Sequence, residues 1–260
     1  MARAHHHYLA SPIWHLSRRR HQRQFLLKFA RDRQARMGWL FEARKRFHLC
    51  VLNYMVTSNH IHLLVYDREG CDLIPNSVQL VAGRSGQAYN QRKQRNGAYW
   101  EDRFHATAVE TGEHFRQCLL YLDLNMVRAG VVTHPEQWPD CGYVEIQYPK
   151  ARRRIIDEEQ LMGLTGASSR LALQQLCRQQ VEAALEQKLL ARQSHWTESL
   201  AVGSAEYIAA LQKQLGSKAS GREIISVEGG CQLRETQTGY RGPFEGQKGG
   251  FSLENTFFWN

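Results

Sequence analysis

Two apolar, strand-like runs separated by only three residues constrain the fold of this 260-residue chain more than any other feature. The first run, FHLCVLNYMV, covers residues 47–56, and the second, HIHLLVYD, covers residues 60–67. The residues between them, Thr57-Ser58-Asn59, are enough for a tight loop. The sequence therefore predicts an antiparallel β-hairpin, and every other element has to pack around it.

The elements on either side of the hairpin indicate an α+β fold. A short strand is predicted near residues 12–18, and an extended stretch at 98–110 leads into a helix at 113–128. Helical spacing of apolar residues predicts two further helices, at 25–46 and 74–94. This order of elements favours a mainly antiparallel sheet with helices packed on it.

The basic run at residues 150–154 marks a predicted domain boundary. At about 150 residues per domain, this length suits one domain with a large extension or two small domains. We therefore predict a first domain at 1–148 and a mainly helical C-terminal extension at 149–260. The extension has helical patterns at 157–164 and 169–192, and it finishes in a glycine-rich tail.

The charge balance suggests a polyanionic partner. The chain has 34 Lys and Arg against 25 Asp and Glu, a formal net charge of +9, and the excess is concentrated within residues 1–36. Such a concentration is typical of nucleic-acid binding, although a solvated basic face would give the same pattern. The candidate DNA contacts are Arg18, Arg19, Arg20, Arg23 and Arg103.

Cysteine usage and hydropathy indicate a cytoplasmic protein. The six cysteines are scattered and include no C-x-x-C pair, which argues against a zinc ribbon and against a disulfide framework. No apolar run approaches the ~18 residues needed to cross a bilayer, so no membrane partner is expected.

The second strand of the hairpin opens with His60-Ile61-His62. Side chains two positions apart on a strand point to the same face, so both imidazoles project together, whereas Ile61 points to the opposite face with Leu63 and Val65. Two adjacent imidazoles are the start of a metal site. The alternative is a pair of half-exposed strand histidines without a ligand.

The helix predicted at 113–128 is apolar in almost every direction except along one stripe. Gln117, Tyr121, Asn125 and Arg128 form this stripe at 100° per residue. A helix that is apolar nearly all round is buried, so its polar side chains need partners. Tyr121 is then either a reactive group or a core tyrosine whose hydroxyl bonds a neighbour.

The two features together suggest phosphodiester chemistry. A tyrosine hydroxyl attacks a phosphodiester if a cation polarises the phosphate. His60 and His62 are placed to hold that cation, with the side-chain oxygen of Asn125 as a third ligand. Mg²⁺ or Mn²⁺ suits this role better than Zn²⁺, because an amide oxygen is a hard ligand.

Four blocks of the sequence resemble one family, in the family's order. SNHIHLLV resembles the histidine–hydrophobe–histidine motif of the HUH endonucleases. YLDLNMVRAGVV is similar to the tyrosine-bearing helix of the REP-associated tyrosine transposases, which commonly reads Y-I-x-x-N-P-V-R-A-G. YWEDRF and SRRRHQRQ resemble two further blocks of that family. The resemblance covers about residues 8–145.

The resemblance implies an HUH, ferredoxin-like fold and a single-tyrosine transposase. Tyr121 would be the nucleophile, and His60, His62 and Asn125 would be the ligands of a divalent metal. The expected reaction is cleavage and strand transfer of single-stranded DNA at hairpins, such as repetitive extragenic palindromes, through a 5′-phosphotyrosine. The active protein would be a monomer or a homodimer. Met126 replaces the family's proline, so the helix is predicted to continue past Asn125 without a kink.

A catalytically silent DNA-binding protein derived from a transposase is the alternative. The presence of all four site residues argues against it, because drift has no reason to spare them together. A zinc-dependent hydrolase is disfavoured, because the sequence has no H-E-x-x-H motif.

Overall fold

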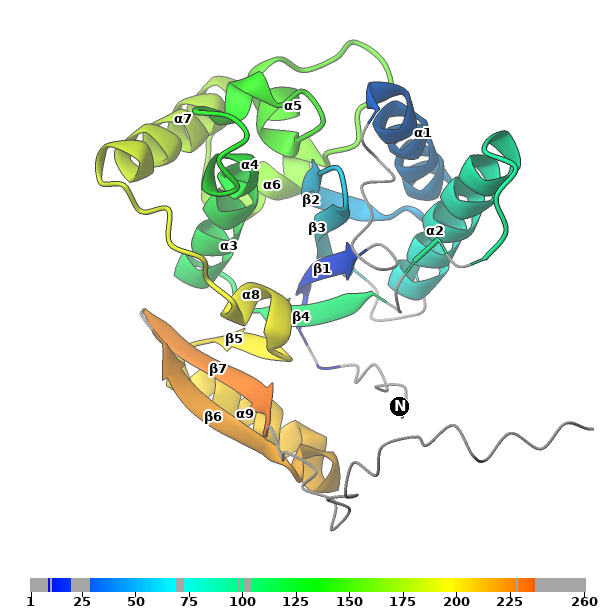
Figure 1. The fold of residues 1–260 in the computed structure, drawn as a ribbon. Helices are drawn as coiled ribbons and strands as arrows, with labels where there is room; N and C mark the ends of the chain where they lie inside the picture. The colour runs from blue at the N-terminus through cyan, green and yellow to red at the C-terminus, as the bar shows by residue number, and fades with distance from the viewer. Residues whose placement is uncertain are drawn as a thin grey trace, which may run out of the picture.

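The computed structural model describes residues 9, 11–19, 29–68, 73–97, 99–100, 104–227 and 229–236. The predicted DNA contacts Arg20, Arg23 and Arg103 lie outside the described residues, as do the side chain of Arg19 and the glycine-rich tail beyond residue 236. The described part of the chain combines helices with one large sheet (Figure 1), which confirms the predicted α+β class.

Within the described ranges, seven strands form a single sheet in the order β2-β3-β1-β4-β5-β7-β6. Every neighbouring pair is antiparallel except β4 and β5, which are parallel. The predicted hairpin is confirmed, because β2 and β3 pair across the three-residue loop. The strands are β1 (Ile13–Arg19), β2 (Cys50–Val56), β3 (His60–Tyr66), β4 (His105–Val109), β5 (Ala201–Gly203), β6 (Arg222–Val227) and β7 (Gly230–Glu235).

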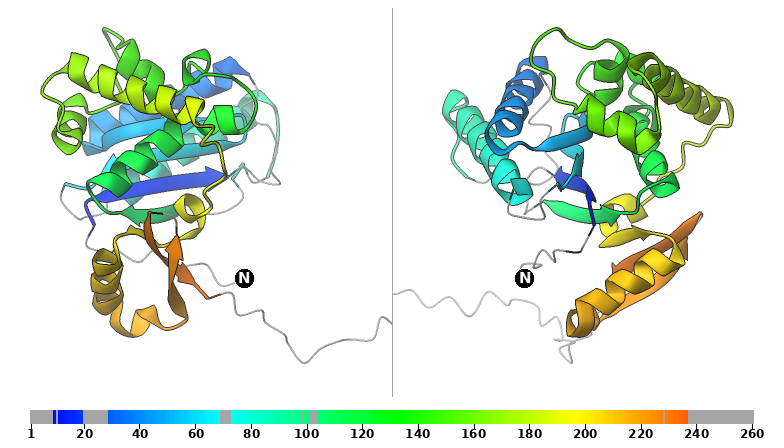
Figure 2. Two further views of the ribbon diagram at one scale, coloured as in Figure 1. Left: turned by 90° about the vertical axis from the view of Figure 1, so that its left-hand side faces the viewer. Right: turned by 180° about the vertical axis from the view of Figure 1, so that it is seen from behind.

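Helices cover both faces of the sheet (Figures 1 and 2). Helices α1 (Ala30–Phe47) and α2 (Leu73–Arg92) pack together on one face, and α3 (Glu113–Asp123) lies on the other with α7 (Arg170–Glu186) packed against it. None of the described helices is long and apolar enough to span a bilayer. The remaining helices are α4 (Asn125–Arg128), α5 (Gly142–Gln147), α6 (Glu158–Thr165), α8 (His195–Glu198) and α9 (Ala205–Leu215), with short 3₁₀ turns at Pro135–Gln137 and Gly216–Ala219.

Strand β3 divides its side chains between the two faces as its alternation predicts. Ile61, Leu63 and Val65 are buried on one face, which confirms the predicted apolar packing. His60 and His62 point to the opposite face, where β1 lies alongside and places Ser17 directly across from His62. The face that carries the histidines is therefore polar at the His60 end, whereas Leu64 farther along the same face is fully buried.

The helix that carries Tyr121 is not continuous. Helix α3 finishes at Asp123, α4 begins at Asn125, and Leu124 between them has φ −82° and ψ 4°. The predicted single helix at 113–128 is therefore interrupted at Leu124, although the chain is helical through Met126, as the absence of a proline there predicts. Two side chains stabilise the break: the Arg128 guanidinium donates to the Tyr121 carbonyl oxygen, and Asp123 accepts a buried hydrogen bond from Asn53 Nδ2 (2.8 Å).

The C-terminal part adds strands as well as helices. Helix α6 lies where the pattern predicts it, and α7 begins as predicted but ends at Glu186 rather than near residue 192. Strands β5, β6 and β7 were not predicted. Strand β5 docks on the outer edge of β4, with the Ala108 amide donating to the Leu200 carbonyl (2.8 Å) and the Glu110 amide donating to the Val202 carbonyl (3.0 Å). The sheet of the first part thus continues into the second.

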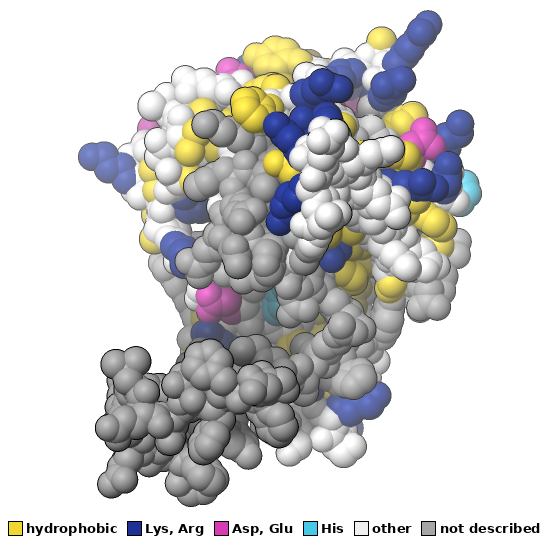
Figure 3. Space-filling model, turned by 45° about the vertical axis from the view of Figure 1, so that its right-hand side comes forward, with side chains coloured by type: hydrophobic (Ala, Val, Ile, Leu, Met, Phe, Trp, Pro, Cys, Tyr) yellow, Lys and Arg dark blue, Asp and Glu magenta, His cyan; other side chains and the backbone are white. Residues whose placement is uncertain are grey.

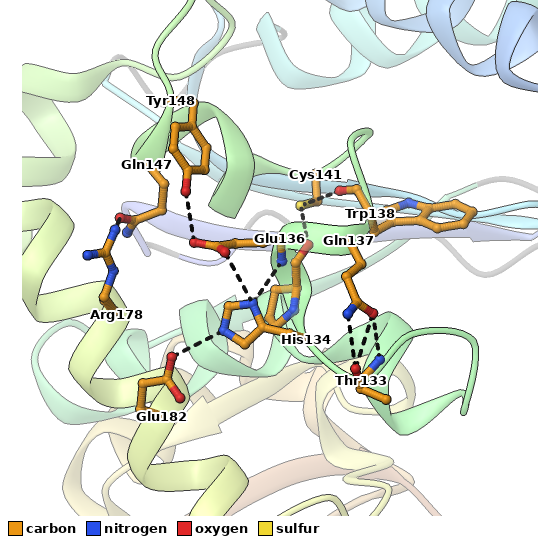
Figure 4. Close-up of polar contacts among 11 residues, drawn as sticks. Thr133, His134, Glu136, Gln137, Trp138, Cys141, Gln147, Tyr148, Arg178 and Glu182 are labelled. Carbon is orange, nitrogen blue, oxygen red and sulfur yellow. Dashed lines mark hydrogen bonds and ion pairs between the residues drawn. The ribbon is translucent and has the colours of Figure 1, made fainter.

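Helix α7 also binds the segment that follows α4 (Figure 4). His134 Nε2 lies 3.3 Å from Glu182 Oε1, and Arg178 Nη2 donates to Gln147 Oε1 (3.0 Å). Residues on either side of the predicted 148/149 boundary therefore contact one another extensively. The division into 1–148 and 149–260 stays a prediction.

Trp196 of α8 provides a test of this docking. Its side chain is 1% exposed and its helix packs on β1 and β4, so Trp196→Ala should lower the free energy of unfolding by about 3–5 kcal/mol. Urea titration measures this change. Leu189→Ala is the control, because Leu189 is 59% exposed and its truncation should shift stability by less than about 0.5 kcal/mol. An unchanged urea midpoint for Trp196→Ala would contradict the docking.

Candidate active site

An open cavity of about 680 Å³ lies between the start of β3 and the α3–α4 junction. His60, His62, Tyr121 and Asn125 all line it. The two histidines and the other two residues come from segments about sixty positions apart in the sequence, and the fold brings them together within one chain. Their chemical roles remain predictions. The other lining residues are Ser17, Thr57, Ser58, Asn59, Met126, Arg128, Ala129, Val131, Arg192 and Thr197.

The two histidines stand side by side on β3. Their ring centroids are 6.2 Å apart, and their planes differ by 24°. His62 is 6% exposed, whereas His60 is half-buried at the loop end of the strand. Both histidines therefore line the same cavity with their rings side by side.

The hairpin loop orients His60. The ring Nδ1 lies 2.6 Å from Asn59 Oδ1, and the His60 amide donates to Thr57 Oγ1 (2.8 Å). A carbonyl oxygen only accepts hydrogen bonds, so the proton of a neutral His60 is on Nδ1 and its lone pair is on Nε2. Local loop chemistry thus sets which nitrogen can act as a ligand.

His62 contacts a third histidine that the sequence did not single out. Its Nδ1 lies 3.1 Å from Nε2 of His15 on β1, and the two ring planes differ by 11° with centroids 5.2 Å apart. The Nδ1 of His15 donates to the carbonyl oxygen of Trp196 (2.7 Å). Burial lowers the pKa of His15 to about 4, so this imidazole is neutral at neutral pH.

Tyr121, in the last turn of α3, contacts several side chains around the cavity. Its ring is nearly perpendicular to that of His62, with centroids 6.5 Å apart, and it also packs on Trp196 at 6.2 Å. Burial raises the pKa of the phenol, and the adjacent Arg128 guanidinium opposes this rise. Tyr121 is therefore protonated at neutral pH and requires electrostatic help to act as a nucleophile.

Arg128 contacts Tyr121 in two ways. Its guanidinium carbon lies 4.0 Å from the centroid of the Tyr121 ring, and its Nη2 donates to the Tyr121 carbonyl oxygen. The residue therefore acts on Tyr121 twice, by a cation–π contact and by a hydrogen bond across the helix break. Asn125, half-buried in the first position of α4, shares the same cavity wall.

The donor set suits a weakly held, hard divalent ion. Among the described residues, no three His, Cys, Asp or Glu side chains gather closely enough to form a metal site by themselves. Two imidazole nitrogens and the amide oxygen of Asn125 would leave coordination positions for substrate oxygens. This combination fits Mg²⁺ or Mn²⁺ better than a closed zinc site.

The structure adds cavity residues and separates one predicted contact from the cavity. Ser17 comes from β1, whereas Arg192 and Thr197 come from the C-terminal part. Strand alternation could have identified Ser17, but nothing local pointed to Arg192. Arg18 points to the face opposite Ser17, where its guanidinium lies 4.7 Å from the Trp100 ring centroid.

Comparisons with known proteins give fold-level likeness only. No protein-family model matches the chain, and no curated protein matches it. One similar solved structure is a REP-associated tyrosine transposase bound to a REP hairpin, with 16% identity, a TM-score of 0.48, and coverage of 60% of this chain and 94% of that one. Another is a proposed transposase from Deinococcus radiodurans R1, with 14% identity, a TM-score of 0.34, and coverage of 50% and 98%. Both scores lie below 0.5, so the functional proposal rests on the geometry of the cavity.

Arg128 tests the description of the helix break. Arg128→Met keeps most of the apolar stem but removes the hydrogen bond to the Tyr121 carbonyl, so it should lower the free energy of unfolding by about 1–3 kcal/mol. Arg116→Met on the exposed side of α3 is the matched control, because its ion pair with Glu113 should contribute less than about 1 kcal/mol. Chemical denaturation of both variants checks this, and equal effects would contradict the assigned role of Arg128.

Proposed function

We propose that the chain is a tyrosine transposase, or single-stranded DNA endonuclease, that cleaves and rejoins DNA at palindromic or hairpin sequences. The observation that carries the proposal is the shared cavity. His60, His62, Tyr121 and Asn125 were selected from two separate sequence motifs, and all four line the same 680 Å³ space. A set of unrelated core residues has no reason to meet at one open surface.

The reaction begins at the Tyr121 hydroxyl. Its oxygen forms an ester bond with the scissile phosphorus, the bond from phosphorus to the 3′ oxygen breaks, and the phenol proton is transferred overall to the departing 3′ oxygen. The products are a 5′-phosphotyrosine and a free 3′-hydroxyl. The ester retains the energy of the phosphodiester, so a second 3′-hydroxyl can reverse the step and join strands without a nucleotide cofactor.

His60, His62 and Asn125 would hold the divalent ion, which neutralises the charge that develops on the phosphate oxygens. The protein's own part is to position the reacting groups. The Tyr121 ring packs perpendicular to the His62 ring, so the phenol lies next to the proposed histidine ligands. The Arg128 guanidinium lies against the Tyr121 ring and limits its movement. The high pKa that burial gives Tyr121 makes this electrostatic assistance necessary.

The substrate is the phosphate backbone of single-stranded or hairpin DNA, with repetitive extragenic palindromes as the class that the motifs suggest. Arg192 is exposed and lines the cavity, where it can contact a phosphate next to the scissile one. Lys and Arg side chains also gather on the face that carries α1 and α2 (Figure 3), which suits the backbone of a longer substrate. The exposed basic residues of these helices and the turn after α2 include Arg31, Lys45, Arg46, Arg84 and Lys93.

The geometry favours a site formed within one chain. Tyr121 and His62 of the same molecule are already in contact, so a second copy is not needed to supply the nucleophile. We propose that a monomer is competent for cleavage, and that any dimer forms for another reason.

Tyr121→Phe tests the mechanism. The substitution removes one oxygen and retains the ring that packs on Trp196, so the thermal melt should be nearly unchanged and DNA binding should survive. Wild type incubated with 3′-labelled hairpin oligonucleotides and Mn²⁺ should give a labelled, denaturant-resistant protein–DNA adduct in gel electrophoresis, whereas a 5′ label should stay on the released fragment. The variant should give neither product. An adduct that persists and maps to another tyrosine would refute the assignment. Binding without cleavage by wild type would favour the catalytically silent alternative.

The metal requirement has a separate test. His60→Ala should abolish cleavage with Mg²⁺ or Mn²⁺, and chelation with EDTA should do the same to wild type, because the phosphate then lacks charge neutralisation. Stability should change little, since His60 is half-buried at a loop. His48→Ala is the control, because His48 is exposed at the end of α1 and lies outside the cavity lining. Cleavage by His60→Ala at the wild-type rate would show that the ligand assignment is wrong.

A further inference from the structure

We propose that His15 is a positioning residue that fixes the tautomer and ring orientation of His62, and that the C-terminal part of the chain anchors it through the Trp196 carbonyl. The proposal rests on the function proposed above, because it assigns His62 a metal to bind. Neither the two-histidine motif nor the tyrosine helix includes His15.

The direction of the two hydrogen bonds of His15 follows from its contact with the Trp196 carbonyl. The Trp196 carbonyl oxygen can only accept, so the proton that lies between it and His15 belongs to His15 Nδ1. In a neutral His15, Nε2 then carries a lone pair and accepts. The 3.1 Å contact is therefore a hydrogen bond donated by His62 Nδ1 to His15 Nε2. With its proton on Nδ1, a neutral His62 has its own lone pair on Nε2.

The opposite proton order would require a doubly protonated His15. That ring is 0% exposed, and its hydrogen-bond partners are an imidazole and a carbonyl, neither of which carries a compensating negative charge. An ion buried in such surroundings is strongly disfavoured. Burial and geometry therefore select the same proton order.

The surroundings keep the Trp196 carbonyl in place. The Thr107 hydroxyl of β4 has one proton between two acceptors, because its Oγ1 lies 2.7 Å from the Ser199 carbonyl oxygen and 3.1 Å from that of Trp196. Strand β1 lies between β3 and β4, so His15 links His62 on β3 to the segment that packs against β4. A continuous path thus runs from the segment before β5 through His15 to His62.

His60 and His62 therefore present the same nitrogen, Nε2, to a metal ion. Asn59 selects the Nε2 lone pair of His60, and His15 selects that of His62. Groups that hold the second nitrogen of a metal-binding histidine typically contribute about 10–100-fold to metal affinity. Removal of His15 should therefore weaken Mn²⁺ binding by about that factor, even without DNA.

The experiment uses the full-length chain and three variants. His15→Phe retains a planar ring without nitrogens. His15→Gln restores one donor and one acceptor on a side-chain amide, which can bridge the Trp196 carbonyl and His62. His105→Phe is the matched control, because His105 also bonds a carbonyl of the C-terminal segment, that of Ser199 (2.9 Å), and it lies outside the cavity lining.

Two readouts separate this proposal from the proposed function. The first is the Kd of Mn²⁺ alone, measured by electron paramagnetic resonance. We expect it to rise about 10–100-fold in His15→Phe, to remain near wild type in His105→Phe, and to recover at least in part in His15→Gln. The second is the ¹⁵N shift pattern of the His62 ring in metal-free wild type, which should show a protonated Nδ1.

Each outcome bears on one proposal. A metal-free wild type whose His62 carries its proton on Nε2 overturns the positioning role, and so does a natively folded His15→Phe with unchanged Mn²⁺ affinity. If wild type binds no Mn²⁺ but His62 shows the Nδ1–H tautomer, the metal-dependent function fails while the orientation by His15 stands.

Discussion

The hydrogen bonds of one fully buried imidazole connect the parts of this molecule. A buried ring must satisfy both nitrogens, because an unpaired polar group without water is costly. His15 meets this requirement with the Trp196 carbonyl on one side and His62 on the other. Both partners have to be in place together: β1 must pair with β3, and the segment before β5 must dock against β4. The sheet, the C-terminal part and the cavity are thus interdependent.

The local half of the site could be predicted because it depends on periodicity alone. A strand returns to the same face after two residues, which places His60 beside His62, and a helix returns after four, which places Tyr121 near Asn125. The hairpin loop was equally local, since three residues between two apolar runs allow few connections. These features needed no knowledge of which elements meet in the fold.

The other half depends on pairings between distant segments, which periodicity does not encode. His15 looked like any residue of a short strand until β1 was placed between β3 and β4. Strand β5 has only three residues, and β6 has exposed positions on both sides of its alternation, so neither gave an apolar pattern to recognise. The break at Leu124 was missed for a related reason. Proline is one way to interrupt a helix, but the side chains of Arg128 and Asp123 provide another, through contacts that form only in the folded chain.

The burial of Tyr121 is unfavourable for one step of the proposed reaction and favourable for the next. At 8% exposure its phenol is harder to ionise, and the guanidinium of Arg128 recovers only part of that loss. The same packing, with Trp196 and His62 against the ring, would shield the ring side of a phosphotyrosine ester from water. An enzyme that only hydrolyses DNA gains nothing from such protection. A site that must keep the ester intact until a second DNA end arrives does gain, so the burial of Tyr121 suits the strand joining that we propose better than simple cleavage.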